Sequence, residues 1–115
     1  MKINDKEDGE NIEVFGIYWG EVFRSAGKIE YVTYFLGLPR DNGGWLMIYD
    51  SREVEIVDSV LKGQWTFFPN RYNGLYYAPL IQEKLLDDVM GREPEAIEKF
   101  IQFAKQDGLL ETGFY

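Results

Sequence analysis

Cysteine and histidine are both absent from this 115-residue chain. Without cysteine, disulfide bonds and thiolate metal sites are excluded, and a reducing compartment is indicated. Without histidine, the chain lacks the commonest metal ligand and the commonest general base at neutral pH. Zinc fingers, Ser-His-Asp triads and Cys-His dyads are therefore ruled out.

Basic side chains are scarce. The chain has 12 lysine and arginine residues against 20 aspartate and glutamate residues, giving a formal net charge of -8. Negative charge repels phosphate backbones, so we expect no binding to nucleic acid. Such a charge would attract a basic protein and raise its association rate. Net negative charge also keeps a small protein in solution. The sequence is compatible with both roles, attraction of a basic partner and solubility.

Long apolar runs are missing as well. No segment approaches the length of a membrane span, and the first ten residues contain no apolar stretch typical of a signal peptide, so we expect a cytoplasmic protein with no membrane contact. Residues 1–11 are mostly charged and have one aliphatic residue after the first position. We therefore predict a mobile arm over 1–11 and a single domain over 12–115.

Apolar residues recur with a two-residue period between positions 12 and 68, which predicts β-strands. The connections between these strands are too short for parallel crossovers, so we predict an antiparallel meander of about five strands. Asn42-Gly43 is the strongest hairpin signal, and Lys62-Gly63 suggests another hairpin. The expected strands cover 12–19 with a continuation to 25, then 29–38, 45–50, the residues from 53, and 64–68.

The period changes to that of a helix after residue 79. Leucine, isoleucine, valine and methionine follow helical spacing over 79–90, and a second amphipathic helix is predicted from Pro94 to Gln106. The fold class is therefore α+β, with two helices at the C-terminus. The ring-rich segment 64–79 joins the two halves, and its aromatic side chains either fill the junction or form a binding platform.

The first two expected strands are apolar on both faces. Two helices cover only one face of an open sheet, so the second face has to be buried in another way or left exposed. Either the sheet curls into a half-barrel, or it stays open and presents tyrosine and tryptophan rings to a partner. We favour curling, because monomers rarely expose large apolar patches.

Two groups of carboxylates stand out. Glu53 and Glu55 lie two residues apart on one strand face, followed by Asp58, a spacing that suits a divalent cation, an acid/base pair or a solvated strand face. Glu83, Asp87 and Asp88 occupy the outer part of the first expected helix. Like charges four residues apart weaken a helix slightly, so Glu83 and Asp87 are either tolerated or kept for a role outside the fold. We find no cofactor or phosphate-binding motif.

In its general format the chain resembles bacterial immunity proteins of polymorphic toxin and contact-dependent growth inhibition systems. The features that carry the resemblance are its short acidic sequence, its tyrosine- and tryptophan-rich strands, the run Gly16-Ile-Tyr-Trp-Gly20 and the two C-terminal helices. The resemblance implies that the protein binds a cognate toxin domain, commonly a nuclease with a basic groove, and blocks it without being an enzyme.

The residues support the same hypothesis of a toxin inhibitor. Acidic side chains would match cationic residues of the toxin, and aromatic side chains would supply buried contact area. The candidate partner-binding residues are Glu53, Glu55, Asp58, Glu83, Asp87, Asp88, Trp45, Tyr72, Tyr76 and Tyr77. Alternative hypotheses are a small carboxylate-based enzyme or divalent-metal protein, and a phage-type mimic of nucleic acid that inhibits a host defence enzyme.

Overall fold

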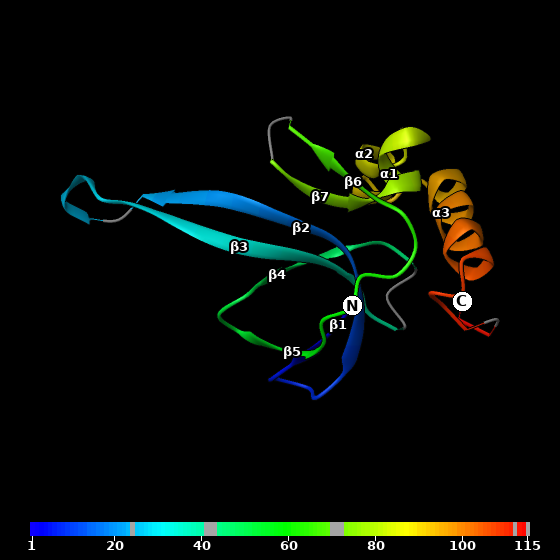
Figure 1. Cartoon of the computed structure of the whole chain (residues 1–115), viewed down its shortest axis with the longest axis horizontal. Coiled ribbons are helices and arrows are strands. Elements are labelled where there is room, and N and C mark those ends of the chain that lie inside the picture. Colours follow the sequence, from blue (N-terminus) through cyan, green and yellow to red (C-terminus); the bar gives the residue numbers. More distant parts are fainter. Residues whose placement is uncertain (24, 41–43, 70–72, 112, 115) are drawn as a thin grey trace.

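The structure is a computed structural model, and it describes residues 1–23, 25–40, 44–69, 73–111 and 113–114. It confirms the α+β class: an antiparallel sheet is followed by three α-helices (Figure 1). The elements are β1 (Lys2–Asp5), β2 (Asn11–Phe23), the short 3₁₀ turn η1 (Ser25–Gly27), β3 (Ile29–Leu38), β4 (Met47–Asp50), β5 (Val54–Asp58), β6 (Trp65–Phe68), β7 (Gly74–Tyr77), α1 (Ala78–Gln82), α2 (Leu86–Met90) and α3 (Pro94–Gln106).

Strands β2 and β3 form the central hairpin of the sheet. Their pairing runs from Glu13 opposite Leu38 to Phe23 opposite Ile29, with a bulge between Val14 and Gly16. Phe15 is the extra residue of this bulge, and its ring contacts aromatic rings of β7 and α3 in the main core. The bulge therefore turns one large side chain of β2 toward the helices.

The strand order differs from the predicted meander. The path is β4-β3-β2-β1-β5, and β7 pairs with a different part of β2 and with β6. Among the described ladders, β5 pairs with β1 rather than β4, and β6 pairs with β7 rather than β5. The hairpin predicted at Lys62-Gly63 is therefore wrong, because each strand pairs with one that the sequence pattern did not reveal. The Asn42-Gly43 turn lies outside the described residues.

The N-terminal segment, which was predicted to be a mobile arm, contains the strand β1. β1 pairs with β2 on one side and with β5 on the other, so its backbone hydrogen bonds are shared with two strands. Ile3 is fully buried, and the N-terminal ammonium forms an ion pair with Glu13 at 3.2 Å. One aliphatic side chain suffices here because two flanking strands offset the entropy of ordering the segment.

The sheet curls, as the two apolar faces of β2 and β3 suggested. β4 and β5 lie at opposite ends of the strand path, yet only residues 51–53 connect them, so the two ends must approach each other. The sheet is not closed, since no described ladder joins β4 to β5. A second core lies inside the curl and consists of Met1, Ile3, Ile12, Val14, Phe35 and Val54.

The helices cover the other face of the sheet. α3 has the predicted bounds and buries Ala96, Phe100, Ile101 and Ala104. The helix predicted over 79–90 is instead divided into α1 and α2, so the expected number of two helices is corrected to three. The division falls at Lys84, whose φ of 54° lies in the left-handed region. None of the described helices has the length and apolar character needed to cross a membrane.

Candidate protein-interaction surfaces

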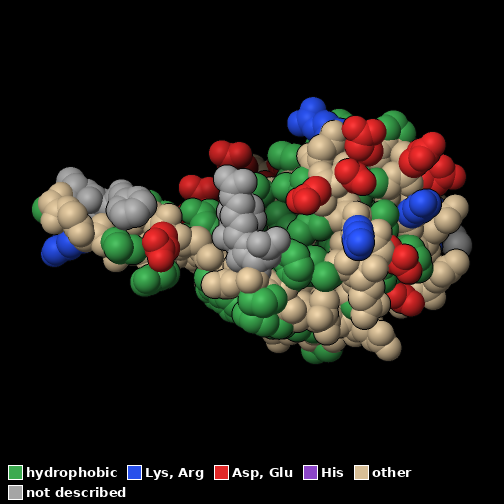
Figure 2. Space-filling view, turned by 90° about the horizontal axis from the view of Figure 1, so that it is seen from above, with side chains coloured by type: hydrophobic (Ala, Val, Ile, Leu, Met, Phe, Trp, Pro, Cys, Tyr) green, Lys and Arg blue, Asp and Glu red, His purple; other side chains and the backbone are tan. Residues whose placement is uncertain are grey.

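A groove with many carboxylates lies between the α1–α2 turn and the start of α3. Its volume is about 790 Å³, and Figure 2 shows acidic side chains gathered over this helical end of the molecule. Four carboxylates and two lysines line it, together with apolar side chains. The lining residues are Glu83, Lys84, Leu85, Asp88, Glu93, Pro94, Glu95, Ala96 and Lys99. We call this surface the acidic groove.

The break between α1 and α2 shapes this groove. The Leu85 N–H donates to the Leu80 carbonyl at 2.9 Å, and both leucine side chains enter the main core. Glu83 therefore ends α1, whereas Asp87 and Asp88 lie in the first turn of α2. The helical repulsion expected between Glu83 and Asp87 does not apply, because no continuous helix carries both residues. Asp87 and Asp88 instead have a favourable position for carboxylates, near a helix N-terminus.

The β5 carboxylates lie elsewhere. Figure 1 places β5 and α2 on different sides of β2 and β3, so the six predicted acidic residues form two separate groups. Glu55 lies in β5 and Glu53 directly before it, so only Glu55 is on the predicted strand; both side chains are exposed. Asp58 accepts a hydrogen bond from the Val60 N–H at 3.0 Å, and this bond holds the pKa of Asp58 below its ordinary value.

Asp50, the last residue of β4, is paired with Arg52. The Arg52 guanidinium donates to Asp50 at 2.7 Å and its backbone N–H donates at 2.8 Å, and these bonds lower the pKa of Asp50. The same guanidinium reaches Glu30 of β3 at 3.4 Å. In the described part of the chain, no three aspartate or glutamate side chains come together as metal ligands.

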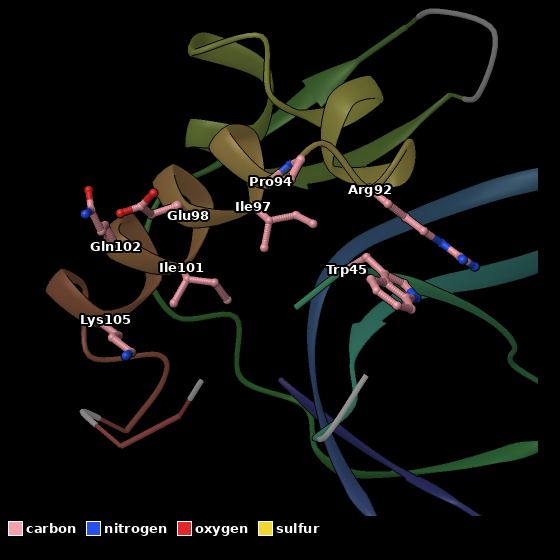
Figure 3. Close-up of a pocket in the computed structure, with 8 residues that line it drawn as sticks. All are labelled: Trp45, Arg92, Pro94, Ile97, Glu98, Ile101, Gln102 and Lys105. Carbon is pink, nitrogen blue, oxygen red and sulfur yellow. The ribbon is translucent and has the colours of Figure 1, made fainter. Parts of the chain in front are cut away.

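Trp45 borders a second groove, of about 540 Å³, beside α3. The Arg92 guanidinium lies 4.3 Å from the centre of a Trp45 ring. Figure 3 shows Ile97 and Ile101 on the side of α3 that faces Trp45. The side chain of Trp45 is partly buried, so it remains a candidate anchor with part of its surface covered by Arg92.

Tyr76 and Tyr77, which were predicted to contact a partner, belong to the main core. Their exposed fractions are 2% and 0%, so neither ring reaches the surface, and the expectation that they anchor a partner is corrected. β7 pairs with both β2 and β6, which places these rings between the sheet and the helices. The interpretation of segment 64–79 as a filled junction fits this burial. Tyr72 lies outside the described residues.

The outer part of the β2–β3 hairpin is exposed, and its residues are not among the partner-binding candidates chosen from the sequence, although an open sheet face presenting tyrosine and tryptophan rings was the alternative to curling. Trp19, Ile29 and Tyr31 are exposed there, with exposed fractions of 44%, 51% and 69%. A signal was present, because these residues belong to the two strands that are apolar on both faces. The β2–β7 ladder ends at Tyr18 and the β3–β4 ladder ends at Tyr34, so neighbouring strands flank only the inner part of the hairpin.

Comparisons of the chain with protein-family models, with curated proteins and with solved structures find no match. The geometry of the described surfaces therefore carries the functional argument.

Proposed function

We propose that this protein is an inhibitor that binds a basic protein partner and blocks its working surface. The partner class that best fits the acidic surface and the resemblance to immunity proteins is a toxin domain with a cationic, nucleic-acid-binding groove. The inhibitor acts in the cytoplasm by covering the partner rather than by a reaction of its own.

The acidic groove is the observation that carries this proposal. Its four carboxylates come from the end of α1, from α2 and from the start of α3, so the packing of these three helices brings their backbone positions together. A groove bearing mainly one sign of charge attracts and orients a partner of the opposite sign. Lys84 and Lys99 lie among the carboxylates and would favour a partner whose cations are spaced to match.

The test uses a panel of purified nuclease domains of bacterial toxins, each inactivated by a substitution of a catalytic residue. Binding of the wild-type chain to each domain is measured at low and at physiological salt. We expect at least one domain to bind with a submicromolar dissociation constant, and its association rate to fall as salt rises. Failure of every domain to bind would contradict the proposed function, and a rate indifferent to salt would remove its electrostatic basis.

Two charge-reversal variants separate local from global charge effects. Glu83→Lys with Asp88→Lys alters the acidic groove, whereas Glu53→Lys with Glu55→Lys makes the same change of net charge on the β5 side. We expect the groove variant to slow association about tenfold and the β5 variant to slow it much less. Equal effects would show that only the total charge matters and that the groove does not face the partner.

A further inference from the structure

The outer part of the β2–β3 hairpin projects from the rest of the sheet. We call residues 19–23 and 29–33 the hairpin arm. The molecule measures 49 × 31 × 25 Å, and Figure 1 shows the arm extending along its longest axis. The β2–β7 ladder ends at Tyr18, and the β3–β4 ladder ends at Tyr34. Beyond the hydrogen bonds from Trp19 to Asn73 and from Ser51 to Thr33, the arm pairs with no other described strand.

The two faces of the arm differ. Trp19 is opposite Thr33 and Glu21 is opposite Tyr31, so these four side chains share one face with Ile29. On the other face Val32 is buried, with an exposed fraction of 3%. The Tyr34 ring lies over Gly20, where an added Cβ would be 2.9 Å from the ring. One face is therefore covered from within the chain, and the face of Trp19 and Tyr31 is not.

We propose that the face bearing Trp19, Ile29 and Tyr31 is a docking surface that inserts into a cleft of a partner protein, one with apolar walls and a basic rim. This inference rests on the proposed function and names the element that reaches the partner. Large aromatic side chains are the residues that most often dominate the binding energy of an interface. Among the described side chains on this face, only Glu21 is charged, and together with the net charge of -8 on the chain this favours a cationic rim.

A second copy of the chain fits this face less well. Each copy has a net charge of -8, and Glu21 lies at the centre of the outer edge of β2 within the arm. Symmetric antiparallel pairing of two such edges would place Glu21 beside its own copy, and like charges in opposite positions destabilise a sheet. Two partly exposed rings and one isoleucine offer roughly 300–400 Å² per copy, about half of what a stable interface buries on each side.

A cleft suits the arm because the arm is a narrow projection. Five residue pairs span about 17 Å, and the two strands lie about 5 Å apart. A flat partner surface would touch only the three apolar side chains, whereas a cleft would enclose the ribbon and also contact the strand edges. The matching partner is therefore concave, as a nucleic-acid-binding groove is.

The binding assay with inactivated nuclease domains tests this inference with three variants. Trp19→Ser with Tyr31→Ser removes both aromatic rings, and Ile56→Ser with Val57→Ser is the matched control, because each of these β5 residues has an exposed fraction of 51%. A third variant replaces residues 21–31 by Asn-Gly, a two-residue hairpin turn between the paired residues Gly20 and Val32. Thermal unfolding of each variant checks that the fold is retained.

We expect both arm variants to raise the dissociation constant at least 100-fold, and the β5 control to change it less than threefold. If a domain binds both arm variants as tightly as the wild type, the arm inference is overturned while the proposed function stands. If no domain binds the wild type, both the proposed function and the arm inference are overturned. Sedimentation velocity supplies the remaining outcome: dimers that both arm variants abolish would overturn the inference in favour of a second copy.

Discussion

The hydroxyl of Tyr77 donates a hydrogen bond to the carboxylate of Asp107, the residue that follows α3. This bond ties the end of β7 to the far end of the longest helix, across the main core. Burial, together with the bond and the negative charge of Asp107, raises the pKa of Tyr77. The phenol is therefore held in its protonated form in the folded state.

This relationship predicts a loss of stability at high pH. Below pH 10 Tyr77 is protonated in both the folded and the unfolded chain. Above pH 10 the unfolded chain loses this proton while the folded chain keeps it, so the free energy of unfolding falls as pH rises. One such group contributes a slope of up to about 1.4 kcal/mol per pH unit. Urea unfolding between pH 8 and pH 11 measures it.

Tyr77→Phe should lower stability by about 1 kcal/mol at pH 8, because the hydrogen bond is lost. Its stability should then fall less steeply than that of the wild type above pH 10. Tyr31→Phe is the control, because the Tyr31 side chain has an exposed fraction of 69%. This substitution should leave the dependence of stability on pH unchanged. Parallel curves for Tyr77→Phe and the wild type would contradict the expectation.

The role of β1 leads to a second prediction. Ile3 is fully buried in the second core, between β2 and β5. Ile3→Ala should lower the free energy of unfolding by about 2–5 kcal/mol, because it leaves a cavity in a packed region. Lys2→Ala, at the exposed neighbouring position, should change stability by about 0.5 kcal/mol or less. Urea unfolding distinguishes these values, and a small effect at Ile3 would mean that β1 contributes little to the fold.

The sequence predicted some elements with their bounds and missed others entirely. β3 and α3 were predicted correctly because each carries its own periodic pattern over ten or more residues. β1 and β7 have only four residues each, and each pairs on one side with its neighbour in the sequence and on the other side with a distant strand, β5 for β1 and β2 for β7. A local pattern cannot reveal the distant partners, which place each short strand between two others. The strand order was wrong for the same reason.

The candidate site shows the same limit. The carboxylates of Glu83 and Asp88 were identified from composition, but Glu93 and Glu95 join them only through the tertiary contact between the α1–α2 turn and α3. The burial of Tyr76 and Tyr77 likewise depends on the pairing of β7 with β2. Sequence periodicity revealed that two strands are apolar on both faces, but not how far along them the sheet curls.

Lys84 provides a third prediction. In a continuous helix Leu80 and Leu85 would lie about 140° apart and could not both enter one core, so the chain breaks between them. Lys84 adopts the left-handed conformation at this break, with a φ of 54°. Lys84→Gly should therefore raise the free energy of unfolding by about 1 kcal/mol, because glycine adopts this conformation without strain.

Gln82→Gly is the matched control for Lys84→Gly. Gln82 is exposed and lies at the end of α1, so glycine there should lower stability by about 0.5–1 kcal/mol. The two substitutions, two residues apart, are thus expected to have opposite signs. Thermal unfolding is a suitable measurement, and destabilisation by both variants would refute the account of the break.

A fourth prediction concerns Gly74, where β7 begins beside β2. A Cβ at this position would lie 2.3 Å from the Ile17 carbonyl oxygen and 2.7 Å from the Tyr18 Cβ. The Ile17 oxygen belongs to the backbone of the central strand, so it cannot move aside as the end of a flexible side chain would. Gly74→Ala should therefore separate β7 from β2 and lower the free energy of unfolding by about 3 kcal/mol. Gly113→Ala is the control, because nothing lies within 4 Å of the added Cβ, and it should have little effect on stability. Urea unfolding of both variants measures the two losses. Equal losses would contradict this account.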